Sequence, residues 1–231
     1  MNTIIEARGI EKSFGQTPAL RGATLSVARG EVLAIMGPSG SGKSTLLHCL
    51  AGILTPDAGE VIFNGTRLDT MSEAKRSELR RDTFGFVFQF GQLVPELSAE
   101  ENIALPLLLS GVRRGPALRE ARAWFPRLGL DGLENRRSGE LSGGQAQRIA
   151  LARGLVAKPE VLFADEPPGS LDSVAGEQVM NLLTAAAREQ GCTVLLVTHE
   201  ARVAAYADRE VIVRDGQVST LTAISYEQST Q

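Results

Sequence analysis

Residues 37–45, GPSGSGKST, bring together three glycines, a lysine and hydroxyl side chains ahead of an apolar run. The spacing matches G-x-x-x-x-G-K-[ST], a pattern whose backbone amides cradle phosphates while the lysine adds a full positive charge. The apolar stretch 31–36 before it predicts a buried strand, and 45–51 predicts a helix that ends at Gly52. We therefore predict a loop that binds a nucleoside triphosphate. Its expected contact residues are Ser39, Gly40, Ser41, Gly42, Lys43, Ser44 and Thr45, and the alternative is a tight turn before a core helix.

Two adjacent carboxylates follow the apolar run VLFA at 161–164. Carboxylates at the end of a buried strand are costly unless they have a purpose. Beside a triphosphate, Asp165 and the Ser44 hydroxyl can hold Mg²⁺, while Glu166 can accept a proton from an attacking water. The alternative is that both acids cap a helix beginning after Pro167 and Pro168.

A second glycine-rich helix entrance occurs at 140–155, ELSGGQAQRIALARGL. Ser142 can cap this helix, and Gly143 and Gly144 leave backbone amides uncovered, which favours anion binding. The first loop already surrounds one side of a triphosphate. This second helix entrance must therefore bind either a different ligand or the other side of that triphosphate. Two copies of the chain enclosing shared ligands satisfy that requirement.

The order of predicted elements indicates an α/β fold with a parallel sheet and right-handed crossovers. Short alternating segments up to residue 28 predict antiparallel strands, and Asn64-Gly65 predicts a hairpin turn within 59–68. The other predicted strands are 84–90, 161–165 and 192–200, with a final hairpin at 209–218; the other predicted helices are 71–81, 146–159 and 176–190.

Residues 92–140 differ in character from the flanking segments and predict a helical lobe, with prolines at 95, 106, 116 and 126 separating short helices. We predict one domain over 1–231. Its core and β-subdomain comprise about 1–91 and 141–218, and 219–231 forms a polar, mobile tail.

Composition limits the possible partners and compartment. The net charge of −3 argues against a general nucleic-acid-binding surface. Cys49 and Cys192 lie in apolar contexts, which favours buried thiols in a reducing compartment. No signal-peptide core and no apolar run of membrane-spanning length is present, so we expect a cytoplasmic chain.

Over Ile4–Val218 the sequence resembles the ATP-binding subunits of ABC transporters, whose signature LSGGQ stands at 141–145 in the expected order with the other motifs. The resemblance implies a P-loop NTPase core with an antiparallel β-subdomain and a helical signature lobe. It also implies an ATPase that requires ATP and Mg²⁺, forms a head-to-tail homodimer and drives a separate integral-membrane permease.

The family's roles can be carried over position by position. Phe14 matches the aromatic that stacks on adenine, and Gln89 matches the glutamine that contacts Mg²⁺ and the lytic water. His199 matches the histidine that holds the γ-phosphate, and Lys43 and Glu166 complete the implied catalytic set. The loop 169–172 matches the segment that communicates between the two sites. The residues implied to face the γ-phosphate of the opposite subunit are Ser142, Gly143, Gly144 and Gln145.

Segments 86–112 and 205–218 look most like the subgroup that serves macrolide export, lipoprotein release, cell division and bacitracin-type resistance. This implies export or mechanical work on the extracytoplasmic side, by a subunit attached to the inner face of the cell membrane through its permease. Three residues depart from the usual pattern, namely Pro168, Ala146 and Gln92, and Pro168 is expected to alter how the loop 169–172 is set.

Two alternatives remain at this point. One is a soluble ABC-type ATPase of an assembly system such as iron–sulfur cluster biogenesis, and the other is a non-catalytic interaction subunit. Five arginines also give the predicted lobe a basic flank, either as a solvated helix face or as a docking surface for a membrane partner. They are Arg113, Arg114, Arg119, Arg122 and Arg127.

Overall fold

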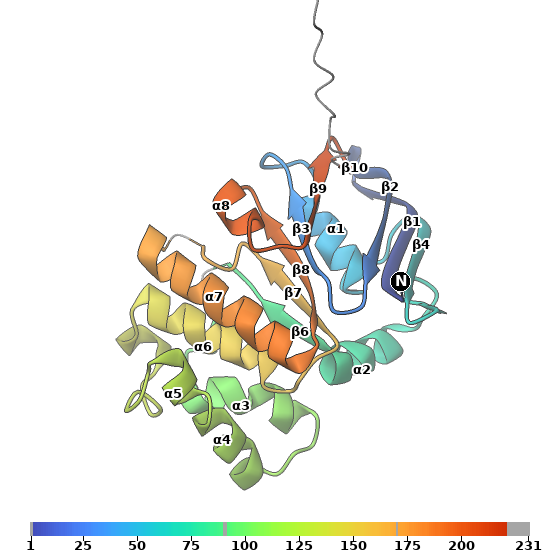
Figure 1. Cartoon of the computed structure of the whole chain (residues 1–231). Coiled ribbons are helices and arrows are strands. Elements are labelled where there is room, and N and C mark those ends of the chain that lie inside the picture. The colour runs from blue at the N-terminus through green and yellow to red at the C-terminus, as the bar shows by residue number, and fades with distance from the viewer. Residues whose placement is uncertain (1, 90–91, 170, 221–231) are drawn as a thin grey trace, which may run out of the picture.

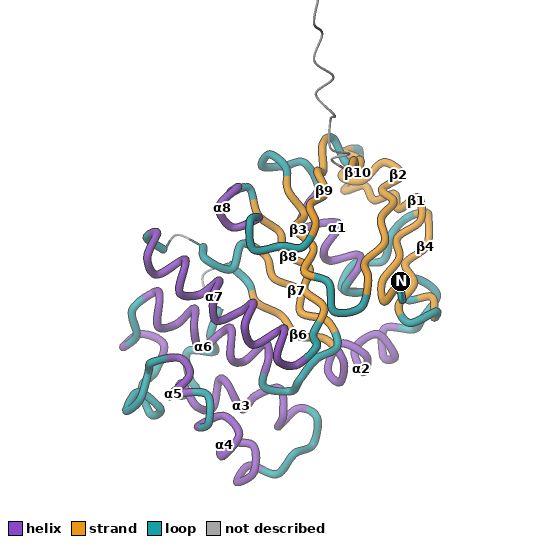
Figure 2. Tube along the Cα trace, viewed as in Figure 1, coloured by secondary structure: helices purple, strands orange, loops and turns teal. Residues whose placement is uncertain are grey.

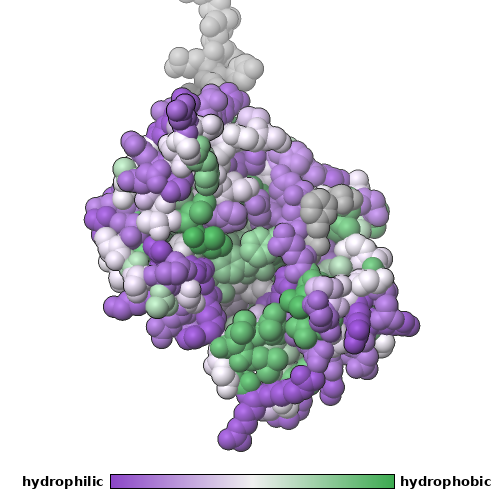
Figure 3. All heavy atoms as spheres, turned by 180° about the vertical axis from the view of Figure 1, so that it is seen from behind, coloured by the Kyte–Doolittle hydropathy of each residue, from purple (hydrophilic) through white to green (hydrophobic). Residues whose placement is uncertain are grey.

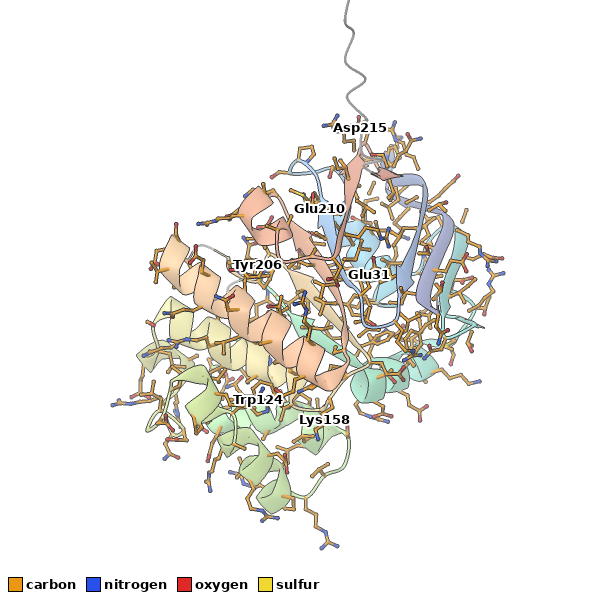
Figure 4. All side chains as sticks on the ribbon, in the orientation of Figure 1. Glu31, Trp124, Lys158, Tyr206, Glu210 and Asp215 are labelled. Carbon is orange, nitrogen blue, oxygen red and sulfur yellow. The ribbon has the colours of Figure 1, made fainter. Side chains whose placement is uncertain are left out.

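The computed structural model describes residues 2–89, 92–169 and 171–220, which form two sheets and a helical lobe (Figure 1). The strands gather on one side of the molecule with some of the helices among them, and the remaining helices form the other side (Figure 2). Trp124 in the helical lobe and Asp215 in the last turn lie at opposite ends (Figure 4). Part of the predicted tail, 221–231, lies outside the described residues.

The smaller sheet is antiparallel, with strand order β2-β1-β4-β5. Its predicted hairpin is confirmed, because Asn64 and Gly65 both have positive φ, 47° and 77°, and so form the turn between β4 and β5. The strands are β1 (Thr3–Phe14), β2 (Thr17–Ala28), β4 (Ala58–Phe63) and β5 (Thr66–Arg67).

The larger sheet has the order β10-β9-β3-β8-β7-β6, parallel except for β10. Residues of β8 alternate between two apolar cores: Val194 and Leu196 pack toward the lobe, whereas Leu195 and Val197 pack toward the smaller sheet. Burial on both faces explains the continuous apolar runs in the sequence. The strands are β3 (Val32–Met36), β6 (Phe84–Val87), β7 (Val161–Asp165), β8 (Thr193–Thr198), β9 (Arg209–Arg214) and β10 (Gln217–Thr220).

Helices cover both faces of this sheet. One face is covered by α1 (Lys43–Leu50), and α6 (Gly143–Leu155) and α7 (Ser173–Gln190) lie toward the lobe (Figure 1). The close packing of α6 on β6 requires glycine, because a Cβ at Gly85 would lie 2.1 Å from the Gly154 carbonyl oxygen. The remaining described helices are α2 (Glu73–Thr83), α3 (Ala99–Leu109), α4 (Arg114–Arg122), α5 (Phe125–Leu128), the 3₁₀ helix η1 (Ser138–Glu140) and α8 (Ala201–Ala204).

The helix predicted at 146–159 is α6, Gly143–Leu155, and three further predictions also differ from the structure. Helix α7 begins before residue 176, because the Asp172 side chain caps it by accepting a hydrogen bond from the Ala175 amide at 3.0 Å. Strand β6 ends at Val87, and Phe90, the predicted end, lies outside the described residues. The third difference is at Pro106, which lies within α3 instead of ending it.

The lobe's basic flank is largely paired with acids. Arg114 lies 2.6 Å from Glu101, and Arg122 lies 2.5 Å from the nearly buried Glu100. Arg127 forms an ion pair with a glutamate of α7. These contacts favour the reading of a structured, solvated helix face. Among the described residues, no helix is both long and apolar enough to cross a membrane.

Candidate functional site

The loop between β3 and α1 has the shape that its glycines predict. Gly42 caps α1 with φ 104°, and a Cβ there would lie 2.4 Å from the Ala19 carbonyl oxygen. The largely buried Lys43 folds over the loop, where Nζ donates to the Gly37 and Pro38 carbonyl oxygens at 2.9 Å each. A positive charge is thus held against a bare, curved backbone, which is the arrangement that suits phosphate groups.

The loop also offers polar groups to a ligand. Ser39, Gly40 and Ser44 are exposed. The Ser41 hydroxyl oxygen is buried and has no hydrogen-bond partner among the described residues. A buried polar atom without a partner is uncommon, and one in a phosphate-binding loop is consistent with a ligand that completes the site.

Asp165 ends β7 beside the start of α1. Burial raises the pKa of its carboxyl group, against the opposing effects of a hydrogen bond with the Ser44 hydroxyl and the positive charge of Lys43. Since burial disfavours the carboxylate, a cation bound at this position would favour the ionised form. Asp165 and Ser44 together therefore form an oxygen-donor pair suited to Mg²⁺.

Glu166 is held by two side chains from neighbouring loops. His199 Nδ1 lies 2.7 Å from Oε1, and Gln89 Nε2 donates to Oε2 at 3.1 Å. The Glu166 side chain retains 24% exposure, so water can reach it. The three residues follow β7, β8 and β6, respectively, and parallel strands present their carboxyl ends at one edge of the sheet.

The backbone at Glu166 is unusual, with φ 46°. Two hydrogen bonds hold it: the Glu166 amide donates to the Val197 carbonyl, and the Gly169 amide donates to the Glu166 carbonyl, at 2.9 and 2.8 Å. A left-handed conformation at a non-glycine residue costs on the order of 1–3 kcal/mol and is typical of functional sites. The strain directs the carboxylate toward Gln89 and His199.

The signature residues lie on the helical side of the molecule. The Ser142 side chain accepts a hydrogen bond from the Gln145 amide at 3.3 Å, and the Ser142 amide donates to Gln145 Oε1 at 2.8 Å, so the predicted cap is confirmed. Gly143 and Gly144 pack toward Leu171. These contacts place 142–145 beside the segment that precedes α7.

Phe14, the predicted adenine contact, lies at the end of β1 with 53% of its surface exposed. An exposed aromatic ring is available for stacking, but its described position adds no contact with the phosphate loop. Ser170, within the predicted communication loop 169–172, lies outside the described residues. His48, the other histidine of the chain, lies in α1.

Sequence reasoning missed two features. One is Gln147, whose buried amide contacts the loops that carry Gln89 and Glu166. The other is a groove of about 440 Å³ between α2, α3 and the end of α6. Figure 3 shows it as a hollow with apolar atoms in and beside it. Only folding brings the groove's residues together.

The strand–loop–helix, the acidic pair after β7 and the sheet order define the P-loop class of nucleoside triphosphatases. Comparison with known proteins narrows the class: residues 20–169 match the family model described as ABC transporter. The chain belongs to the ABC transporter family, and within it to the ATP-binding subunits, which hydrolyse ATP.

The curated relatives agree in function. The chain is 44% identical to the lipoprotein-releasing system ATP-binding protein LolD of Porphyromonas gingivalis, over 92% of this chain and 97% of the relative. It is likewise 44% identical to LolD of Myxococcus xanthus, over 94% and 98%. The subgroup indicated by the sequence is thereby confirmed.

Solved structures agree in fold. The dimeric bacterial ABC transporter cassette MJ0796, described in a post-hydrolysis state with ADP and phosphate, superposes with a TM-score of 0.85 at 35% identity, covering 94% of this chain and 99% of that one. CbiO1 of Clostridium perfringens, part of the complex cbiONQ, gives 0.84 at 30% identity, covering 95% and 88%. The predicted fold class is confirmed.

Proposed function

We propose that this chain is the ATP-binding subunit of a lipoprotein-releasing transporter, in which two copies close head to tail around two Mg²⁺–ATP and drive a separate permease. The observation that carries the proposal is the Glu166 carboxylate, positioned by Gln89 and His199 beside a phosphate-binding loop. Relatives with that function match more than nine-tenths of the chain. We place the subunit at the cytoplasmic face of the membrane, where ATP is available.

In this proposal the loop 39–45 binds the phosphates and Phe14 stacks on adenine. Lys43 exchanges its contacts with two loop carbonyls for contacts with phosphate oxygens, which are better acceptors for an ammonium group because they are charged. Phosphate binding also places negative charge at the N-terminus of α1, where the helix dipole favours it.

Ser44, Asp165 and Gln89 are the residues that would hold Mg²⁺. Among the described residues, no group of three or more histidine, cysteine and acidic side chains could hold a metal ion. Such a sparse donor set suits an ion that shares its coordination with substrate phosphates. When bound, Mg²⁺ neutralises phosphate charge.

The hydrolytic step requires a base and a fixed geometry. Glu166 accepts a proton from the attacking water, Gln89 orients the carboxylate and the water, and His199 contacts the γ-phosphate. His199 Nδ1 faces Glu166 Oε1, and Nε2 on the other side of the ring contacts the phosphate; both nitrogens donate when each carries a hydrogen. Positioning of this kind supplies most of the catalysis in phosphoryl transfer.

The second copy provides the signature residues 142–145. The location of these residues at the start of α6 supports a head-to-tail pairing, in which each signature helix faces the triphosphate of the other copy. The MJ0796 cassette is described as a dimer, which supports a pairing of two copies. We therefore propose that each ATP site is formed by the phosphate loop of one copy and the signature residues of the other.

We assign the permease contact to the groove, whose lining combines apolar side chains with three arginines, Arg80, Arg81 and Arg153. Apolar lining residues include Phe84, Phe86 and Leu109, and Leu109 is 64% exposed. An amphipathic segment with apolar and acidic side chains would complement both features. Since Gln92 also lines the groove, an occupant there lies close to Gln92.

The test is co-purification of tagged Glu166→Gln protein in mild detergent with ATP and Mg²⁺, followed by mass spectrometry. We expect a membrane partner with a large extracytoplasmic domain, and we expect Leu109→Glu to remove it. Thr66→Glu, on the exposed edge strand β5, serves as the matched control and should retain the partner. Soluble partners alone would contradict the proposal and favour the assembly-ATPase alternative.

A further inference from the structure

Gln147 connects the two loops that carry the hydrolytic residues. Its side chain is almost fully buried in α6, with 2% exposure. Nε2 donates to the Phe88 carbonyl oxygen at 3.3 Å and also to the Pro167 carbonyl oxygen. Phe88 immediately precedes Gln89, and Pro167 immediately follows Glu166, so one amide group bridges the two segments.

The position of this bridge is significant because the sheet no longer connects these segments. Strands β6 and β7 pair in parallel up to Val87 and Ala164. Beyond that pair β6 and β7 no longer pair with each other, and the Gln147 amide joins the segments that follow them instead. A primary amide nitrogen carries two hydrogens, and both are used here.

We propose that Gln147 is a positioning residue for ATP hydrolysis: it fixes the spacing between the two loops so that Gln89 reaches Glu166. The hydrogen bond from Gln89 Nε2 to Glu166 Oε2, at 3.1 Å, depends on that spacing. Small displacements of catalytic groups lower rates strongly, whereas nucleotide binding depends on the phosphate loop. Removal of the amide therefore lowers kcat and leaves KM nearly unchanged.

The same bridge ties the hydrolytic pair to the signature motif. Helix α6 begins beside Ser142 and carries Gln147 on its second turn. In the dimer proposed above, a movement of the N-terminal end of α6 thus also moves Gln147, and with it the Phe88 and Pro167 carbonyls to which Gln147 is bonded. Gln147 is the described side chain of α6 that hydrogen-bonds to both loops.

The first variant is Gln147→Met, which retains length and volume but has no donor. We expect kcat to fall at least tenfold while KM changes less than twofold. The control is Thr184→Val, which removes another buried hydrogen bond, from the Thr184 hydroxyl to the Met180 carbonyl at 2.9 Å within α7. It should lower the melting temperature without changing kcat. A Gln147→Met rate within twofold of wild type would overturn the inference.

A double-mutant cycle with Gln89→Ala distinguishes the proposed positioning role of Gln147 from a purely structural one. If Gln147 acts through Gln89, adding Gln147→Met to Gln89→Ala causes little further loss, whereas independent effects multiply. Multiplying effects would overturn the inference. If Gln147→Met fails to fold, Gln147→Asn takes its place, since it keeps an amide that is too short to reach both carbonyls.

This inference rests on the proposed hydrolytic role of Glu166, and the two can fail separately. Wild-type protein that releases no phosphate with its partner present would overturn the proposed function. Normal wild-type turnover with an unchanged Gln147→Met rate would overturn the role of Gln147 alone.

Discussion

His199 Nδ1 lies 2.7 Å from Glu166 Oε1, so a residue after β8 directly holds the carboxylate that follows β7. The contact joins two of the positions at which the sequence predicts catalysis. Gln89 holds the other carboxylate oxygen, and the acid therefore has little freedom to rotate. A carboxylate held in one orientation suits a group that must accept a proton from a water molecule at a fixed position.

Replacement of His199 by alanine should impair hydrolysis more than binding. The variant removes the donor to Glu166 and the proposed γ-phosphate contact, and we expect a loss of about 10²-fold in kcat. ATP affinity should change much less, because the phosphate loop remains intact. Steady-state phosphate release and a fluorescent-ATP titration measure the two effects, and a rate within twofold of wild type would contradict the assignment.

Replacement of Lys43 by alanine should act on binding itself. A charge-assisted contact with phosphate is worth about 1.5–3 kcal/mol, which corresponds to a rise of about tenfold to a hundredfold in the ATP dissociation constant. Lys158→Ala, on the loop between α6 and β7, is a matched control (Figure 4). Equal affinity of both variants in a calorimetric titration would exclude Lys43 as a phosphate ligand.

The close packing of α6 on β6 predicts a sharp difference between two glycines. Gly85→Ala places a Cβ 2.1 Å from a backbone oxygen, and the required shift should lower the free energy of unfolding by about 1–3 kcal/mol. Gly139→Ala meets open space and should have little effect. Urea denaturation compares them, and equal midpoints would show that α6 does not constrain β6.

Both thiols should be unreactive in the native protein. Burial raises the pKa of Cys49 and of Cys192 to about 12, from an ordinary value of 9.0. The folded state thus favours the neutral thiol, and this contribution to stability is complete below pH 9 and is lost as the pH rises toward 12. At pH 8, a disulfide reagent should label both cysteines only after unfolding; rapid labelling of native protein would contradict their burial.

Much of the fold could be predicted from local patterns. The glycine-rich loop, the apolar strands and Asn64-Gly65 specify their own conformations. The predicted start of helix α7 was less accurate, because the helix begins where Asp172 caps it. Pro106 was read as a helix break, but it falls in the last turn of α3, where packing of Ile103 and Ala104 in the lobe core outweighs one missing backbone hydrogen bond.

The candidate site was predictable only where a motif is contiguous or matches the family. Glu166 and Lys43 each follow a strand with a recognisable pattern. Gln147 has no such signal, because its role depends on the meeting of two loops that are 79 residues apart, at Phe88 and Pro167. The groove likewise combines distant segments and emerges only from packing. The roles of Phe14 and of residues 142–145 remain predictions.

The most direct test of the account is phosphate release from Mg²⁺–ATP by the chain purified with its membrane partner. We predict steady turnover by the wild type and at least a 10²-fold slower rate for Glu166→Gln, with ATP binding retained. Glu210→Gln on β9 should match the wild type (Figure 4). Equal phosphate release by wild type and Glu166→Gln would contradict the role of Glu166 as the base, and with it the central claim.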